Sequence, residues 1–418
     1  MAVDPDGSPL SAAAGGAASE PEGIPPQPEA GGAPSEPEGP SEPEGPSEPE
    51  GPSEPEVPSE PEGDCSEPPL ARRAELLWRR DVDYFYGLAG PGLLGYSPDG
   101  AQIVTPADQY VMQGYSVIRA SDATELETAQ VVLFGRDATW THELRGDGEP
   151  YRFDGIGVFE RAGGTRLFGL GEALETARIS GDGRYVAALK CGDVPRVERY
   201  SVSDGSVFSM PVSEAQSPCA VSYYGYHGLQ SLSLPVSFGF SGSSMAYSID
   251  GRDRVAVVDA GTGGVSEHRL GLVGESSLPA DALVTLALSP SEALLATVAN
   301  HTLRVSHRDG LTPALPDLPA GVTLAFTNCY CEPRYFSPVA WSADGRSLAA
   351  VDPDLAVVIR RSCDGAPIAR IENSWAAPKL DEIPGPALIA FSPDGASIAV
   401  YSFDADFGAA LSVYRLEP

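Results

Sequence analysis

Cysteines provide the most reactive side chains of this sequence, and two of them are only one residue apart. Cys329 and Cys331 flank Tyr330, and Cys363 follows later in the chain. Structural zinc is held by four ligands, so three thiolates without a fourth ligand make a poor zinc site. A disulfide and free thiols are the two other states open to these residues. We expect no bound metal, and the spacing leaves the choice between disulfide and thiol open.

The histidines and carboxylates show no pattern typical of catalysis. His301 and His307 lie six residues apart on either side of one expected strand, and neither His-Glu-x-x-His nor Gly-x-Ser-x-Gly occurs in the sequence. Asp404 and Asp406 resemble a carboxylate pair, but in so acidic a chain they are typical of a solvated loop. We therefore predict no catalytic residue, no cofactor and a protein that is not an enzyme.

Charge and proline content divide the chain in two. The net charge is −32, and residues 1–70 hold 17 acidic residues, no Lys or Arg, 18 of the 40 prolines and no aromatic residue. From Ser35 to Asp64 the sequence repeats Ser-Glu-Pro-Glu-Gly-Pro with small changes. Regular prolines oppose helix and sheet, and the segment has too little apolar surface to fold. We predict a disordered acidic tail at 1–70, either a solvating tail or a spacer or bait for a basic partner, and a folded domain at 71–418.

Charge and hydropathy argue against a nucleic-acid partner and against a membrane-spanning helix. Nucleic-acid binding needs Lys and Arg gathered on one face, which a net charge of −32 argues against. No apolar run reaches the roughly 18 residues of a membrane-spanning helix.

The sequence leaves the compartment open. The six cysteines are split between the two parts, and the five in the domain cannot all pair with one another. They are Cys65, Cys191, Cys219, Cys329, Cys331 and Cys363. The first residues show no signal-peptide pattern, which favours the cytoplasm. An acidic, Pro-rich spacer before a domain is also typical of anchored surface proteins, so an exported protein with another N-terminus is the alternative.

A turn motif, Ser-x-Asp-Gly, recurs between apolar segments of residues 71–418, and weaker copies follow Phe240 and Leu288. Its Ser and Asp side chains accept hydrogen bonds from nearby amides, and its Gly can take a positive φ, so the motif closes hairpins. One active site would not need four copies of its acid. We predict that the four motif aspartates are structural turn residues: Asp99, Asp182, Asp344 and Asp394.

Each hairpin is followed by a further strand and turn, so each repeat predicts four short antiparallel strands. The repeats recur at about 48 residues, and the long interval between Ser97 and Ser180 has room for one degenerate copy. Helical patterns are almost absent. The sequence thus predicts an all-β, seven-bladed β-propeller with four-stranded antiparallel blades, preceded by the disordered acidic Pro-rich tail.

Residues 76–418 resemble the bacterial WD-repeat-like propeller family, which includes the C-terminal propeller of TolB. The resemblance rests on Phe391-Ser392-Pro393-Asp394-Gly395 before an apolar strand, and on the copies of this motif. It implies a propeller and says little about function. The Trp-Asp dipeptide is missing, and residues 1–70 offer no counterpart of TolB's small α/β domain, so a TolB role is not implied.

A propeller must join its first and last blades, or two strand edges stay open. The last repeat lacks a fourth strand, while Leu76–Arg79 is an apolar segment without a place in the first repeat. We predict that Leu76–Arg79 pairs with Leu411–Arg415 as the outer strand of the last blade. Trp78 would then be buried against that blade.

Aromatic residues gather in three long connections between repeats. In propellers of the family that this sequence resembles, such connections lie on one face. Aromatic side chains on loops are typical anchors of protein interfaces, although they can also cap the core between blades. The candidates are Tyr223, Tyr224, Tyr226, His227, Tyr330, Tyr335, Phe336 and Trp375. We expect a monomeric protein-interaction or scaffold module with a protein partner. The alternatives are a small-ligand, carbohydrate-binding or hydrolytic propeller that uses its central tunnel, and an exported surface or envelope protein mounted on the acidic spacer.

Overall fold

The computed structural model divides the chain into two units, Met1–Val57 and Pro58–Pro418. All residues described below belong to the second unit. They are 65, 73–82, 94–97, 99–106, 115–129, 140–144, 156–160, 166–171, 174–179, 184–190, 194, 196–211, 237–238, 242–248, 254–270, 285–299, 301–321, 323–325, 334–372, 385–403 and 409–417. Apart from Cys65, the tail predicted at 1–70 lies outside the described residues.

Antiparallel sheets make up the described structure, and six of them have four strands. Three of these are β2 (Gly95–Tyr96), β3 (Gln102–Pro106), β4 (Tyr115–Arg119) and β5 (Glu125–Ala129); β9 (Leu174–Ile179), β10 (Tyr185–Lys190), β11 (Arg196–Ser201) and β12 (Val207–Pro211); and β13 (Ser237–Phe238), β14 (Ser244–Ser248), β15 (Arg254–Asp259) and β16 (Val265–Arg269). The other three are β17 (Thr285–Leu288), β18 (Leu294–Ala299), β19 (Thr302–His307) and β20 (Leu318–Pro319); β23 (Val339–Trp341), β24 (Ser347–Val351), β25 (Val357–Arg361) and β26 (Pro367–Ile371); and β27 (Gly385–Phe391), β28 (Ser397–Phe403) and β29 (Ala409–Glu417) with β1 (Arg73–Val82).

Two smaller sheets complete the set. One has three strands, β6 (Trp140–Leu144), β7 (Ile156–Glu160) and β8 (Arg166–Gly171), and the other is a hairpin of β21 (Thr323–Ala325) and β22 (Arg334–Phe336). Every element assigned in the described residues is a strand. The predicted all-β class with four-stranded antiparallel blades is therefore confirmed.

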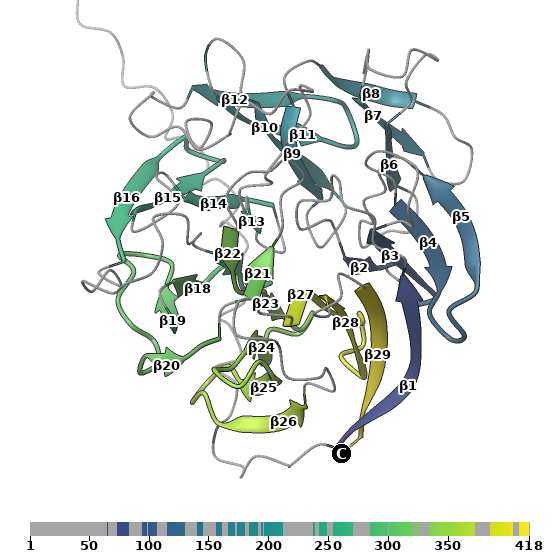
Figure 1. Cartoon of the computed structure of the whole chain (residues 1–418). Helices are drawn as coiled ribbons and strands as arrows, with labels where there is room; N and C mark the ends of the chain where they lie inside the picture. Colours follow the sequence, from purple (N-terminus) through teal and green to yellow (C-terminus); the bar gives the residue numbers. More distant parts are fainter. Residues whose placement is uncertain are drawn as a thin grey trace, which may run out of the picture. The chain divides into compact units, whose positions relative to one another are not determined.

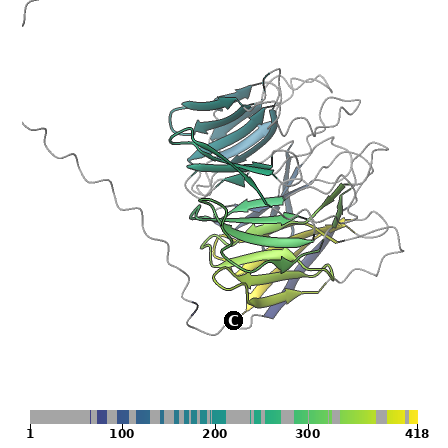
Figure 2. The same ribbon diagram turned by 90° about the vertical axis from the view of Figure 1, so that its left-hand side faces the viewer.

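The sheets follow one another around a ring, with β2, β9, β13, β23 and β27 toward the centre and β1 on the outside (Figure 1). Contacts link neighbouring inner strands: β9 with β13, β13 with β17, β17 with β23, β23 with β27, and β27 with β2. Figure 2 shows the ring on edge, with β1 running beside the strands of the last sheet. This radial packing is that of a β-propeller. We call β2–β5 the first blade, β23–β26 the penultimate blade, and β27–β29 with β1 the last blade.

The core lies between adjacent blades because both faces of their middle strands are covered. Ala349 and Ile359 of the penultimate blade are buried in one cluster with Ile398 and Val400 of the last blade. A strand buried on both faces needs an almost continuous apolar sequence rather than an alternating one. Leu295–Ala299 of β18 is an example, since Thr297 is its single polar residue and all five side chains are buried.

The Ser-x-Asp-Gly motif forms the same turn wherever the structure describes it in full. At Ser342, the hydroxyl donates to Asp344 Oδ1 at 2.6 Å, the Arg346 amide donates to the same oxygen at 3.0 Å, and the Ser347 amide donates to Ser342 Oγ at 2.9 Å. Corresponding bonds occur around Asp99 and Asp394. Their glycines have φ between 67° and 71°. Asp182 lies outside the described residues. That these aspartates serve structure alone stays a prediction.

One weaker copy uses a different residue in the glycine position. Glu292 has a φ of 66° and is buried, with 4% of its surface exposed. Its carboxylate reaches the preceding blade, where it accepts from the Ser243 amide at 3.0 Å and from the Ser243 hydroxyl. Arg308 Nη1 lies 3.6 Å from the same carboxylate. Glu292 thus holds a backbone conformation that glycine adopts more readily, while its side chain links two blades.

The ring closes through β1, which pairs with β29 antiparallel from Arg73–Glu417 to Val82–Ala409. This includes the pairing that the sequence predicts, with Arg79 opposite Ser412. The burial expected for Trp78 was overstated, because the side chain is only half-buried. It packs on a cluster shared by the last and first blades, and its indole N–H donates to the Ala120 carbonyl of the first blade at 2.7 Å. Trp78 thus joins two blades rather than being enclosed by one.

Candidate interaction surface

The structure describes only two of the eight residues predicted for a partner-binding face. Tyr223, Tyr224, Tyr226, His227, Tyr330 and Trp375 lie outside the described residues. Tyr335 and Phe336 were expected on a loop, but they belong to β22, where they pair with Leu324 and Thr323 of β21. The expectation failed because Thr323–Ala325 can extend and pair across the connection, which turns part of it into a hairpin.

This hairpin is an insertion between β20 and β23, and its strand β21 contacts β27 of the last blade. In Figure 1 it lies near the middle of the ring. Gly321 fixes its beginning: the Gly321 amide donates to the Val351 carbonyl at 2.8 Å, and a Cβ at Gly321 would lie 2.0 Å from the Asp352 carbonyl oxygen. Only glycine allows this approach, so the hairpin is anchored to the turn after β24.

The anchoring turn is itself organised by a buried carboxylate. Asp352 Oδ1 accepts from the amides of Asp354 at 3.0 Å and Ala356 at 2.9 Å, and its other oxygen pairs with Arg370. Arg370 also pairs with Glu372 at 2.8 Å. A buried charge that is paired and hydrogen-bonded in this way holds a fixed turn beneath the hairpin.

A groove with a volume of ≈ 760 Å³ lies between the first and last blades. Residues from turns of both blades line it. One residue of each outer strand also lines it, Leu77 of β1 and Leu126 of β5. These leucines are 38% and 41% exposed, although leucine in a strand is usually covered. The groove therefore offers apolar walls to a partner.

Carboxylates accompany those walls. Asp99 and Asp394, each in a Ser-x-Asp-Gly turn, line the groove and are exposed. The Ser392 hydroxyl and the Ala396 amide donate to Asp394 and lower the pKa of that carboxyl below its usual range, so it is ionised at neutral pH. Arg119 is the basic residue of the lining, and it pairs with Asp122 at 3.0 Å. The groove therefore carries negative charge beside apolar surface.

Tyr96 adds a polar group beneath this surface. Burial, together with the charge of Asp394, raises the pKa of the Tyr96 phenol, so the ring stays neutral. Its hydroxyl is buried without a hydrogen-bond partner in the structure, as is Gln102 Oε1 on the adjoining strand. Both residues line the groove.

Residues far apart in the sequence build this groove, which is why the sequence did not indicate it. The pairing of β1 with the last blade was predicted, but that pairing alone does not show that Leu77 and Leu126 line one groove at the junction with the first blade. A useful signal was available in β1 itself. Leu76 and Leu77 are adjacent in the sequence, whereas a strand with one covered face usually alternates apolar and polar residues. The structure leaves both leucines exposed.

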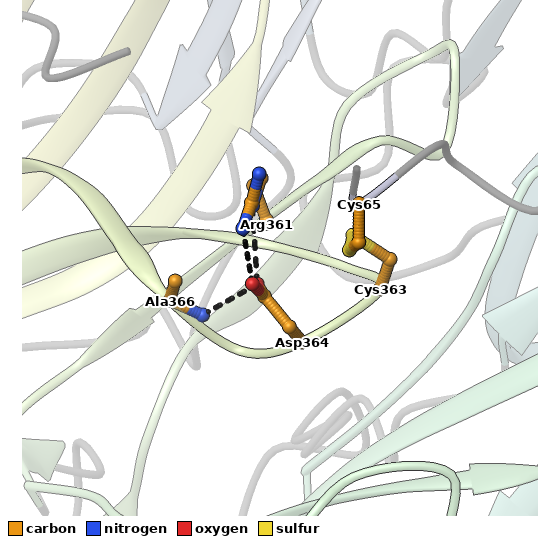
Figure 3. The surroundings of a disulfide bond; sticks show 5 residues. All are labelled: Cys65, Arg361, Cys363, Asp364 and Ala366. Atoms are coloured by element: carbon orange, nitrogen blue, oxygen red, sulfur yellow. Dashed lines mark hydrogen bonds and ion pairs between the residues drawn. A yellow bond between two sulfur atoms is a disulfide. The ribbon is translucent and has the colours of Figure 1, made fainter. Parts of the chain in front are cut away.

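The cysteines form one further group with potential metal-binding chemistry. Cys65, Cys363 and Asp364 are the single group of metal-ligand type found in the described residues. Cys65 and Cys363 are joined in a disulfide, so neither sulfur is a thiolate ligand in this state (Figure 3). The sequence left the choice between a disulfide and free thiols open, and for Cys65 and Cys363 the structure shows a disulfide. The other four lie outside the described residues.

Comparison with known proteins identifies the fold alone. No family model and no curated protein matches the chain. Among solved structures, the β-propeller domain of Cps50 (Swd1) from Myceliophteria thermophila is similar, with 12% sequence identity and a TM-score of 0.50 over 82% of this chain and 99% of that one. This likeness supports the propeller seen in the sheet order. None of the described segments is a helix suited to crossing a membrane.

Proposed function

We propose that this protein is a non-catalytic protein-interaction module, and that the groove between its first and last blades binds a partner segment carrying a basic side chain next to an apolar one. The observation that supports the proposal is the pair of exposed leucines, Leu77 and Leu126, beside the exposed carboxylates of Asp99 and Asp394. Interfaces take up exposed apolar side chains as anchors, and opposite charge speeds and orients the encounter.

The charge of the whole chain favours the same kind of partner. A net charge of −32 repels acidic proteins and attracts basic ones over the range of the Debye length, about 8–10 Å at physiological salt. The groove adds local specificity to this general attraction, because its charge stands next to apolar walls. A basic partner should therefore bind more weakly as salt is raised.

The propeller that presents this groove has, in our proposal, seven blades. Six sheets have four strands, and in Figure 1 the sheet β6–β8 lies between β5 and β9, which supports a seventh position in the ring. We assign this three-stranded sheet as the degenerate repeat that the sequence places between Ser97 and Ser180. The aromatic residues predicted for a partner-binding face stay a second candidate for the same function, and of these Tyr335 and Phe336 belong to β22.

A library of random peptides displayed on phage and selected on the full-length protein tests the proposal. Selected peptides should carry Lys or Arg beside an apolar residue. Changing Leu77→Ser and Leu126→Ser together should weaken the binding of such a peptide at least about tenfold, as expected for lost anchors. The matched control is Val207→Ser with Val265→Ser, which removes exposed apolar side chains of similar strands, 51% and 44% exposed, on other blades.

The outcomes distinguish a wrong binding site from a wrong function. Equal losses in the groove and control variants would remove the groove as the site. Binding that survives both pairs of changes but disappears with Tyr335→Ala and Phe336→Ala would move the site to the aromatic surface. A selection that yields no saturable peptide binding would contradict the interaction function itself.

A further inference from the structure

A disulfide holds the chain shortly before the strand that closes the ring. Cys65 and Cys363 are 298 residues apart in sequence, and their Cα atoms are 6.2 Å apart. Cys363 lies in the turn between β25 and β26, on the penultimate blade. Cys65 precedes Arg73, the first residue of β1, by eight residues. The bond therefore attaches the chain, eight residues before the closing strand begins, to the penultimate blade.

The turn that carries Cys363 is well supported. In Figure 3, Asp364 points toward Arg361 and the Ala366 amide, which donates to Asp364 Oδ1 at 2.9 Å. Arg361 pairs with the same carboxylate. These contacts fix the turn on the blade without any help from the disulfide. Breaking the disulfide would therefore leave the Cys363 side in place.

The closing strand is already held from two directions, and the disulfide adds a third restraint. Trp78 and Arg80 bond to the first blade through the Ala120 and Ala123 carbonyls. On the other side, β1 contacts β26, and Ala74 packs against the core between the penultimate and last blades. The disulfide acts upstream of both, at the end where a strand frays first.

Neither cysteine is buried. Thiol–disulfide exchange needs access of the attacking thiolate to a sulfur, which is easier in a turn than inside the core. A disulfide enclosed by the blades would lack this property. The position therefore suits a bond that is made and broken in the folded protein.

We propose that Cys65–Cys363 is a reversible redox lock on ring closure. A dithiol reductant of the thioredoxin class donates two electrons and two protons: the S–S bond breaks, both cysteines become thiols, and the reductant becomes a disulfide. A disulfide oxidant such as oxidised glutathione reverses the exchange. In the reduced state β1 stays paired with β29 but opens more often from its Arg73 end. Since Leu77 of β1 is a wall of the groove, the lock also controls that groove, a consequence that rests on the proposed function.

Counting thiols in the full-length oxidised protein, alkylated after unfolding, tests the bond itself. Cys65→Ser removes one cysteine but frees Cys363, so the number of free thiols should rise by one relative to the wild type. A count that falls by one would show that Cys65 is free and would overturn the proposal. The direction of the change is informative whatever the state of the other four cysteines.

Hydrogen exchange of the β1 amides tests the lock, with no partner present. Treatment with dithiothreitol should speed exchange near Arg73 by about tenfold or more, and oxidised glutathione should restore the slow rate. The control is the double variant Cys65→Ser with Cys363→Ser, whose fast exchange should not respond to either reagent. Unchanged β1 exchange on reduction of the wild type would overturn the lock, even if the disulfide is present. Neither readout depends on the groove binding anything.

Discussion

Glu292 allows the cost of an unusual backbone conformation to be separated from the value of a link between blades. Three variants divide the two effects. Glu292→Ala removes the carboxylate and keeps a side chain at a φ of 66°, Glu292→Gly removes both, and Glu292→Gln keeps the size but loses the charge. All three can be compared by equilibrium unfolding in urea, monitored by circular dichroism.

The structure supplies the magnitudes. The Glu292 carboxylate accepts two hydrogen bonds from Ser243 and lies 3.6 Å from Arg308 Nη1. Hydrogen bonds to a charged group contribute about 1.5–3 kcal/mol each when buried, and the losses are not additive, so Glu292→Ala should cost about 3–4 kcal/mol. A positive φ costs a residue with a Cβ about 1 kcal/mol relative to glycine. Glu292→Gly should therefore be about 1 kcal/mol more stable than Glu292→Ala, and Glu292→Gln should fall between Glu292→Ala and the wild type.

Gly395 provides an internal control for the backbone effect. It has a φ of 67°, and a Cβ there would meet no atom within 4 Å. Gly395→Ala therefore measures the conformational cost alone, and it should match the difference between Glu292→Ala and Glu292→Gly. If Glu292→Ala costs less than about 0.5 kcal/mol, the carboxylate does not stabilise the junction. If the two differences disagree by more than about 1 kcal/mol, the backbone conformation is not what separates the Glu292 variants.

Two further predictions concern the closing strand and the response to pH. Trp78→Phe loses the indole hydrogen bond to the first blade and should cost about 1 kcal/mol in urea unfolding, similar to Trp341→Phe, which loses a corresponding 3.0 Å bond to the Ala287 carbonyl; a Trp78→Phe protein as stable as wild type would contradict this role. The folded state lowers the pKa of Asp394, so its contribution is present above the unfolded pKa of about 4 and is lost as pH falls through the folded value. Burial raises the pKa of Tyr247 to about 12, so its contribution is complete below pH of about 10 and is lost as pH rises toward 12. Melting temperatures across pH should fall at both ends, and a stability that rises below pH of about 4 would contradict the carboxylate assignment.

Features set by neighbouring residues were open to prediction from the sequence. The Ser-x-Asp-Gly turn carries its own hydrogen bonds, so the motif around Asp344 indicated the hairpin that the structure contains. Closure was predictable as well. Leu76–Arg79 was an expected strand without a partner, and the last repeat lacked its fourth strand. Glu292 was missed as a link since its partner, Ser243, belongs to another blade, and the sequence does not show how two turns face each other.

Long-range pairings account for the remaining differences. Cys65 was grouped with the tail on composition, and nothing local indicates that it reaches residue 363, because the pairing of cysteines does not follow from their spacing. The groove is lined by residues of two blades, such as Leu77 and Leu126, which are far apart in the sequence. Tyr335 was expected on a loop, since the three-residue strand that pairs with it is too short to stand out as a periodic pattern.

The order of synthesis gives the closing strand an unusual history. Among the strands that the structure describes, β1 is the first to be synthesised and its partner β29 comes after all the others. At roughly 5–20 residues per second, translation separates the two by some tens of seconds. During that time the blades can form one by one, while β1 has no partner strand to pair with. A ribosome that stalls before residue 409 leaves a nascent chain with an open ring, and such a chain exposes the edge strands that quality-control chaperones bind. Closure of the ring therefore depends on residues 409–417, although the strand that they pair with was synthesised first.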